Sequence, residues 1–123
     1  MSVNPYQKYK EETIMTMTQG ELLVLLYDEL MKRITAAELF AGQEKYEMYE
    51  EQMDRAEKIV RHLRETLDFQ YGISRELYQM YDFLLIEFSR AKVSRKTENL
   101  GRIKTMVGDL RDAFKEAEKK VEQ

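Results

Sequence analysis

Several residue types are scarce or missing in this chain. The sequence has no cysteine, no tryptophan, one proline and five glycines in 123 residues. Without cysteine the chain can form neither a disulfide nor a thiolate metal site, which suits a reducing cytosol. Its longest uninterrupted apolar run covers residues 22–27, whereas a helix that crosses a bilayer needs ~20 apolar residues. We therefore expect no secretory or transmembrane segment, no membrane insertion and a cytoplasmic location.

Neither sign of charge dominates. The 20 basic and 23 acidic residues give a net charge of -3 and are interspersed along the chain. Proteins that bind nucleic acid usually carry a basic patch or stripe, so nucleic acid is not an expected partner. A chain of 123 residues is long enough for one hydrophobic core and too short for two. A single domain is therefore expected.

Residues that favour helices make up most of the sequence. Glu, Lys, Leu, Met, Arg and Ala dominate while turn-forming residues are few, which predicts an all-α fold. There are also eight methionines, which is many for a chain of this size. Methionine fills irregular gaps in a core and also serves adaptable binding surfaces. Both roles stay open for each of them.

The first predicted helix begins in a strongly apolar stretch. Thr18 and Glu21 fit a capping box, so the helix should run from about Gln19 to Ala41 and stop at Gly42. The consecutive apolar residues that follow Glu21 cover every side of this helix. Because a helix that faces a single core needs an apolar stripe of only about 100°, this end should be contacted from at least two directions.

Three further helices are predicted from apolar residues that alternate three and four positions apart. Their seams consist of Tyr46, Tyr49, Met53, Ala56, Val60, Leu63 and Leu67; of Leu77, Tyr81, Leu84, Phe88 and Ala91; and of Leu100, Ile103, Val107, Leu110, Phe114, Ala117 and Val121. Residues 70–74 are expected to form a loop, with Ser74 as the N-cap of the third helix. Residues 94–97 form the next turn, with Thr97 as the N-cap of the fourth.

Short connections between long helices determine the topology. Four helices of ~20 to 27 residues, each ~30 to 40 Å long, must be antiparallel neighbours when no connection can cross the bundle. We therefore predict an antiparallel up-down-up-down four-helix bundle in residues 18–123, preceded by an extended or short-helical tail in residues 1–17. The tail contains Tyr6, Tyr9 and Ile14 and is too apolar to be freely solvated.

The single histidine, His62, gives little support to a catalytic role. A histidine-phosphotransfer site normally needs a nearby lysine and a glycine that leaves room for the phosphoryl group, yet Leu-Arg-Glu-Thr follows His62. A surface histidine is the preferred interpretation. Di-iron bundles need Glu-x-x-His pairs, whereas Ile59 stands three places before His62. No nucleophile stands beside a base and no glycine-rich phosphate loop is present, so we expect no enzyme, no metal and no cofactor.

Apolar residues outside the seams point to a binding surface. Phe83 and Ile86 fall off the seam of the third helix, and Gly101, Thr105 and Gly108 form a row of small residues on the fourth. A glycine inside an exposed helix costs roughly 1 kcal/mol relative to alanine. The row therefore either lets another backbone approach closely or is merely tolerated.

Four sequence blocks, in the same order, resemble those of the bacterial flagellin-specific secretion chaperones. They are NPYQKY, TMTQGELLVLLYDEL, the pair Tyr81-Asp82 within LYQMYDFLL, and LRDAF at residues 110–114. The resemblance runs from residue 4 to about residue 114. The family usually has proline where Gln19 stands and tryptophan where Phe114 stands. Both residues keep the local role, because glutamine is accepted in the first helical turn and phenylalanine fills an aromatic core position.

The resemblance implies a cytosolic chaperone that binds the disordered C-terminal segment of flagellin and prevents premature polymerisation. It also implies delivery to the flagellar type III export apparatus, with an export-gate component as a further partner. The excess of apolar surface predicts the same kind of protein more generally, because amphipathic segments can lay their apolar faces against a bundle. A helical oligomer or adaptor, in which identical subunits bury that surface, and the less favoured phosphotransfer domain remain alternatives.

Partner contacts are expected on the tail and on three of the helices. The residues are Tyr6, Tyr9, Ile14, Leu22, Leu25, Tyr27, Phe83, Ile86, Gly101, Thr105 and Gly108. Tyrosines combine a large apolar face with a polar tip, so the tail could cover the binding surface while flagellin is absent and still be released into water. The competing hypothesis is that the tail itself contacts flagellin.

Overall fold

The described part of the chain consists of helices joined by short connections. A computed structural model describes residues 19–122, with side chains as far as residue 119. This part contains α2 (Gln19–Gly42), α3 (Tyr46–Glu65), α4 (Ile73–Ser94) and α5 (Leu100–Glu122). The bounds agree with the predicted helices to within a few residues. The predicted capping box at Thr18 and the tail residues Tyr6, Tyr9 and Ile14 lie outside the described residues, so the division between tail and bundle stays a prediction.

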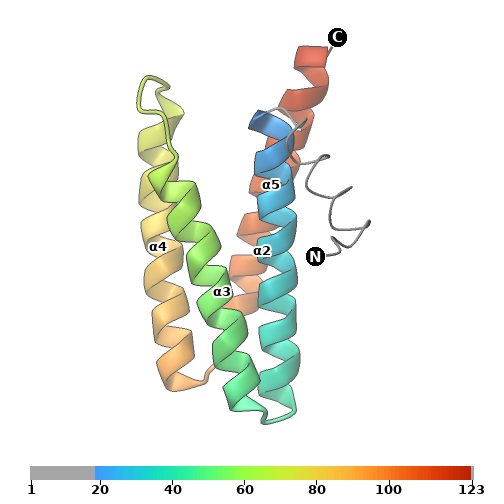
Figure 1. The fold of residues 1–123 in the computed structure, drawn as a ribbon, viewed down its shortest axis with the longest axis vertical. Helices are drawn as coiled ribbons and strands as arrows, with labels where there is room; N and C mark the ends of the chain where they lie inside the picture. Colours follow the sequence, from blue (N-terminus) through green and yellow to red (C-terminus); the bar gives the residue numbers. More distant parts are fainter. Residues whose placement is uncertain (1–18, 123) are drawn as a thin grey trace, which may run out of the picture.

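The helices form the predicted antiparallel up-down-up-down bundle. α2 packs against both α3 and α5, and α3 packs against α4. Consecutive helices run in opposite directions, and the last turns of α5 extend past the other helices at one end (Figure 1). The start of α2 and the connection between α3 and α4 lie at that same end (Figure 1). The turn between α2 and α3 and the connection between α4 and α5 lie at the opposite end.

Two residues with left-handed backbone form the turns at that opposite end. Glu44 has φ 58°, and the N–H groups of Glu44 and Lys45 donate to the carbonyls of Ala41 and Phe40. This is the pattern of a Schellman turn, in which the left-handed position usually belongs to glycine. Gly42 ends α2 as predicted, but its own φ is not positive. Arg95 ends α4 with φ 60°, and its N–H donates to the carbonyl of Ala91.

Two of the predicted helix caps are wrong. α4 begins at Ile73, so Ser74 lies inside the helix, where its hydroxyl donates to the Asp68 carbonyl and ties the connection to the helix. α5 begins at Leu100, three residues after Thr97, and the Leu100 N–H donates to the main-chain carbonyl of Thr97. Both helices begin two residues away from the start that the predicted cap implies, which is the usual uncertainty of a helix end.

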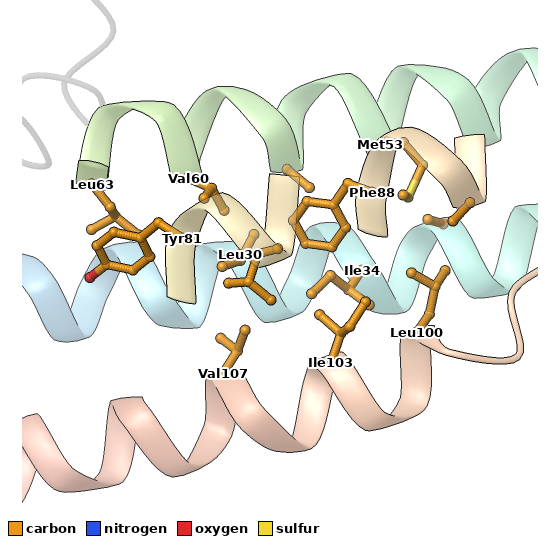
Figure 2. Close-up of a cluster of buried hydrophobic side chains, with 14 of the residues drawn as sticks. Leu30, Ile34, Met53, Val60, Leu63, Tyr81, Phe88, Leu100, Ile103 and Val107 are labelled. Atoms are coloured by element: carbon orange, nitrogen blue, oxygen red, sulfur yellow. The ribbon is translucent and has the colours of Figure 1, made fainter. Parts of the chain in front are cut away.

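The predicted seams supply the core. Side chains from all four helices meet along the bundle axis (Figure 2). The buried apolar residues are Tyr27, Leu30, Ile34, Ala37, Tyr49, Met53, Ala56, Val60, Leu63, Leu77, Tyr81, Leu84, Phe88, Ala91, Leu100, Ile103 and Val107. Burial decreases toward the end of α5, where Leu110 and Phe114 are half-buried and Ala117 is exposed. The seam loses its cover there because α5 continues past the neighbouring helices.

Ion pairs connect the helices that pack against each other. Between α2 and α5 they join Glu38 to Lys104 and Asp28 to Arg111, and between α3 and α4 they join Asp82 to Arg64 and Asp54 to Lys92. The closest nitrogen–oxygen distances in these pairs are 2.6 to 2.8 Å. Partly exposed pairs of this kind contribute roughly 0 to 1 kcal/mol each, so the apolar core supplies most of the stability.

Candidate functional site

The described residues offer no arrangement suited to metal binding. Between residues 19 and 119 no three His, Cys, Asp or Glu side chains come together as a set of metal ligands. None of the helices in the described part has the length and apolar character needed to cross a membrane. His62 lies exposed on α3. The features that could bind a partner are instead a cavity and two groups of exposed apolar side chains.

A cavity of about 680 Å³ opens at the end of the bundle where α3 and α4 are connected. We call it the end cavity. Its lining comes from all four helices and from the connection: Gln19, Leu23, Leu63, Thr66, Leu67, Asp68, Tyr71, Ile73, Ser74, Leu77, Tyr81 and Phe114. Volumes of 300 to 1,000 Å³ with a mostly apolar lining are typical of ligand sites. The end cavity can therefore accept several large side chains of a partner.

The lengths of the helices explain why this end stays open. α3 ends at Glu65, whereas α5 continues to Glu122 and passes beyond the α3–α4 connection. The Thr66 hydroxyl donates to the carbonyl of His62 at 2.9 Å, and the Ser74 hydroxyl donates to that of Asp68. These bonds hold the connection at the rim, where it lies beside the cavity rather than across it.

Two buried tyrosines lie at the inner end of the cavity. The hydroxyls of Tyr27 on α2 and Tyr81 on α4 are 2.5 Å apart, and the ring of Phe114 lies 5.6 Å from that of Tyr27. Tyr81 lines the cavity, whereas Tyr27 is fully buried and does not line it. The Tyr81 oxygen points along the bundle toward the open end, past Leu63 (Figure 2). Burial raises the pKa of both phenols, so both are protonated at neutral pH.

Exposed aromatic residues surround the mouth of the cavity. Phe69 and Tyr71 in the connection are 62% and 67% exposed, and Ile73 at the start of α4 is 56% exposed. The ring of Phe69 lies 5.9 Å from that of Tyr78, and the Arg64 guanidinium lies 5.8 Å from the Tyr78 ring centre. An apolar mouth beside an apolar cavity is typical of a protein-binding surface.

A second apolar surface follows α4 on the side away from the core. Phe83, Ile86 and Val93 are all exposed, Val93 to 82%. Phe83 and Ile86 lie off the seam of this helix as predicted, and Val93 lies off it as well. We call these residues the α4 outer face. The α4 outer face and the mouth of the cavity together contain most of the large exposed apolar side chains of the described part, all between residues 69 and 93.

The three predicted contact residues on α2 occupy two different environments. Leu22 and Leu25 are half-buried, and Leu25 lines a shallow hollow between α2 and α5. Tyr27 is fully buried in the core. It can therefore influence a partner through Tyr81 but does not itself present a surface.

The small residues on α5 do not form one open row. Gly101 is exposed with open space around it, and the Thr105 hydroxyl donates to the Gly101 carbonyl at 3.1 Å. Gly108 is half-buried, and a Cβ at this position would lie 3.5 Å from the terminal methyl of Met31. Gly108 thus faces α2, whereas Gly101 and Thr105 face solvent.

Sequence reasoning missed most of the residues that line the cavity. Leu63, Leu77 and Tyr81 were assigned to the core, and their side chains are indeed buried. The missed signal is their position, because each lies in the last or first turns of a helix beside the longest predicted loop. The apolar character of that loop, with Phe69 and Tyr71 in it, could also have indicated the site.

Comparison with known proteins gives the family. A family described as "Flagellar protein FliS" matches residues 2–121 of the chain. The "Flagellar secretion chaperone FliS" of Bacillus subtilis (strain 168) is 31% identical over 114 residues, which cover 93% of this chain and 86% of that protein. A crystal structure described as that of a flagellar chaperone from bacteria matches 94% of this chain and 95% of its own with a TM-score of 0.80. At 22% identity that structure supports the fold alone. Matched over nearly its whole length, the chain belongs to the FliS family of flagellar secretion chaperones.

Proposed function

We propose that this protein is a cytoplasmic export chaperone that binds the disordered C-terminal segment of flagellin. It prevents premature polymerisation of flagellin and assists its delivery to the flagellar type III export apparatus, where an export-gate component is a further partner. Membership of a chaperone family across nearly the whole chain carries this proposal. The family consists of chaperones rather than enzymes, in agreement with the absence of a catalytic motif from the sequence.

The end cavity supports binding of an amphipathic segment. Its mouth is apolar on the side of the α3–α4 connection, and its walls come from all four helices. An amphipathic helix can place one or two large apolar side chains inside and lay the rest of its apolar face over the mouth. A disordered segment loses conformational entropy when it folds on binding, so it needs a long interface. The α4 outer face would extend that interface beyond the cavity.

A titration with flagellin tests the proposal directly. The purified C-terminal segment of the flagellin from the same genome is added to the protein while helix content is followed by circular dichroism. We expect the helical signal of the mixture to exceed the sum of the parts, with a dissociation constant in the micromolar range or tighter. A signal that never exceeds the sum would contradict folding on binding.

A pair of leucine variants tests whether the end cavity is the docking surface. Leu67 lines the cavity from the connection, outside any helix, and Leu39 is exposed on α2 at the other end of the bundle. Leu67→Arg places a charge where an apolar side chain should dock, so we expect binding at least about tenfold weaker. Leu39→Arg should bind as the wild type does. Equal affinity of the two variants would exclude the cavity.

Residues 1–17 have a proposed role as a reversible cover, with Tyr6, Tyr9 and Ile14 as anchors. The described structure does not include them, so the proposal rests on their apolar composition and on the end cavity, which Gln19 lines. Removal of residues 1–16 should increase binding of a hydrophobic dye and leave flagellin binding equal or tighter. Weaker flagellin binding by the truncated, folded protein would mean that the tail itself contacts flagellin.

The exposed part of α5 is a further proposed contact. Gly101 has open space around it, so Gly101→Leu can be accommodated by the fold and blocks only an approaching partner. Weaker flagellin binding with unchanged or slightly raised stability is expected. Unchanged binding would exclude this face.

Self-association through the α4 outer face would support the alternative function as a helical oligomer. Sedimentation velocity distinguishes such an oligomer from a monomer.

A further inference from the structure

The hydroxyls of Tyr27 and Tyr81 have one more hydrogen than they can use with each other. Each neutral phenol offers one hydrogen and accepts at its oxygen, and the two hydroxyls are 2.5 Å apart. One hydrogen lies between the two oxygens, which leaves the second without an acceptor in the pair. Within residues 19–119 neither hydroxyl has another hydrogen-bond partner. Both side chains are almost completely buried, at 0% and 1% exposure.

The position of the cavity indicates which hydroxyl carries the unused hydrogen. Only Tyr81 lines the end cavity, and its oxygen points toward the open end of the bundle (Figure 2). Tyr27 does not line the cavity, and its hydroxyl has no other hydrogen-bond partner among the described residues. The arrangement with the fewest unsatisfied groups is therefore a relay, in which Tyr27 donates to Tyr81 and Tyr81 donates into the cavity. Hydrogen bonds in such a chain strengthen each other.

The third buried tyrosine shows the alternative arrangement. The Tyr49 hydroxyl donates to the Ala91 carbonyl at 2.5 Å, so its hydrogen is used inside the fold. A buried polar group without a partner is destabilising, and most buried hydroxyls in proteins are paired. The acceptor for a hydrogen that points into the cavity therefore comes from outside residues 19–119.

We propose that Tyr81 is a specificity-determining residue of the end cavity and donates a hydrogen bond to the side-chain amide of an asparagine or glutamine in the flagellin segment. This inference rests on the proposed function, since it names the recognition chemistry of the same site. Apolar side chains of the segment fill the cavity, and the amide fixes which register of the segment can dock. An apolar cavity alone discriminates weakly between similar segments, whereas a buried donor rejects a segment that lacks the acceptor.

The surroundings of Tyr81 favour an amide over other acceptors. A carboxylate would lose its hydration in an apolar cavity that offers a single neutral donor, which is strongly unfavourable. Main-chain carbonyls of a docked helix are already used by the helix itself. An amide oxygen accepts from Tyr81, while an amide N–H group can donate to a free lone pair on the Tyr81 oxygen. A primary amide thus complements the tyrosine pair.

The double variant Tyr27→Phe with Tyr81→Phe is the central test. Removing one hydroxyl would leave the other unpaired in the core. Replacing both tyrosines with phenylalanine, which has the same shape, is nearly neutral for folding. We expect the double variant to melt close to the wild-type temperature and to bind the flagellin C-terminal segment at least about fivefold more weakly. The matched control is Tyr49→Phe, which removes a buried hydroxyl at the far end and should change the affinity by less than about twofold.

The same interaction can be tested from the partner's side, with no change in the chaperone. Each asparagine and glutamine of the segment is replaced by leucine in turn, and affinities are measured by calorimetry with the wild type and with the double variant. One replacement should weaken binding to the wild type by at least about fivefold and leave binding to the double variant unchanged. The replacements in the segment remain a test if the double variant does not fold. The measured quantity is then the loss of affinity for the wild-type chaperone.

The outcomes separate this inference from the proposed function. Wild-type binding that is equal to that of the folded double variant overturns the role of Tyr81 and leaves flagellin binding standing. The absence of any amide replacement that weakens wild-type binding overturns it too. A wild type that does not bind the segment overturns the proposed function and this inference together.

Discussion

Buried tyrosines lie near both ends of the bundle, but their hydroxyls are satisfied in different ways. At the end with the α2–α3 turn, the Tyr49 hydroxyl donates to the Ala91 carbonyl, and the guanidinium of Arg95 covers the Tyr46 ring at 4.3 Å. We call this the closed end. At the open end the hydroxyls of Tyr27 and Tyr81 meet only each other among the described residues, beside a cavity of about 680 Å³.

The difference indicates which end residues 19–122 complete by themselves. At the closed end, short turns bring the helix termini together, and the Tyr49 hydroxyl finds its acceptor within the fold. At the open end the connection is longer, α5 continues past it, and large apolar side chains such as Phe69 and Tyr71 remain exposed. Exposed apolar surface of this kind is a liability unless a partner covers it. The open end is therefore the part of the structure that flagellin is proposed to complete.

The largest expected effect is on the free energy of unfolding, when a phenylalanine in the core and one at the end cavity are each replaced by alanine. Phe88 is fully buried in the closed half of the core, and Phe114 is half-buried at the end cavity. Phe88→Ala should lower the free energy of unfolding by about 3 to 5 kcal/mol, the usual range for a buried ring. Phe114→Ala should lower it by about half as much, because its ring already borders open space. Urea unfolding monitored by circular dichroism measures both. Equal losses would mean that the open end is packed as tightly as the core.

The protein should lose stability at alkaline pH because of its three buried phenols among the described residues. Burial raises the pKa of Tyr27, Tyr49 and Tyr81 above the ordinary value near 10, with the neighbouring Glu50 also raising that of Tyr49. Their contribution to stability is complete below about pH 10 and is lost above it, because the unfolded phenols ionise first. Each phenol should contribute a slope of up to about 1.4 kcal/mol per pH unit.

The tyrosine variants divide this slope between the two ends. Above pH 10 the free energy of unfolding of the wild type should fall with pH. The double variant at Tyr27 and Tyr81 lacks two of the buried phenols and should lose the larger part of this slope. Tyr49→Phe lacks one and should lose the smaller part. Lysine ionisation is common to all the proteins and cancels in the comparison. Chemical denaturation at pH 9 to 11 supplies the data. A double variant with the wild-type slope would show that the phenols at the open end already ionise in the folded state.

The smallest expected effect concerns the turns of the closed end. Glu44 has φ 58°, a conformation that costs a residue with a Cβ atom about 1 kcal/mol relative to glycine. Glu44→Gly should therefore raise the free energy of unfolding by about 0.5 to 1 kcal/mol. Arg95→Gly relieves the same strain but removes the cation–π contact with Tyr46, so its gain should be smaller. Thermal melts of both variants measure the difference, and a destabilised Glu44→Gly variant would contradict the strain argument.

The core could be predicted from the sequence because heptad spacing is a local property. Met53, Val60, Phe88 and Val107 were each assigned to a seam from neighbours three and four positions away, and each is buried. The caps were harder. Ser74 and Thr97 are plausible caps locally, but α4 begins at Ile73 and α5 at Leu100, so the type of a single residue does not determine where a helix begins.

The end cavity depends on distances that no local pattern contains. Tyr27 and Tyr81 are 54 residues apart in sequence, and a tyrosine in a seam has the same periodicity as a phenylalanine. The cavity itself arises from where α3 stops relative to α5. Phe83 and Ile86 could be predicted to lie on the surface because they fall off the seam, which is again a local signal. Both side chains are exposed in the structure.

Methyl NMR of the complex tests the central claim most directly. The protein is labelled at leucine and isoleucine methyl groups, and spectra are recorded as the C-terminal segment of flagellin is added. We predict that the methyl signals of Leu23, Leu67 and Ile73 at the end cavity shift or broaden, while that of Leu39 near the closed end stays unchanged. Perturbation confined to the closed end, or binding that leaves the cavity signals unchanged, would contradict the claim that flagellin completes the open end.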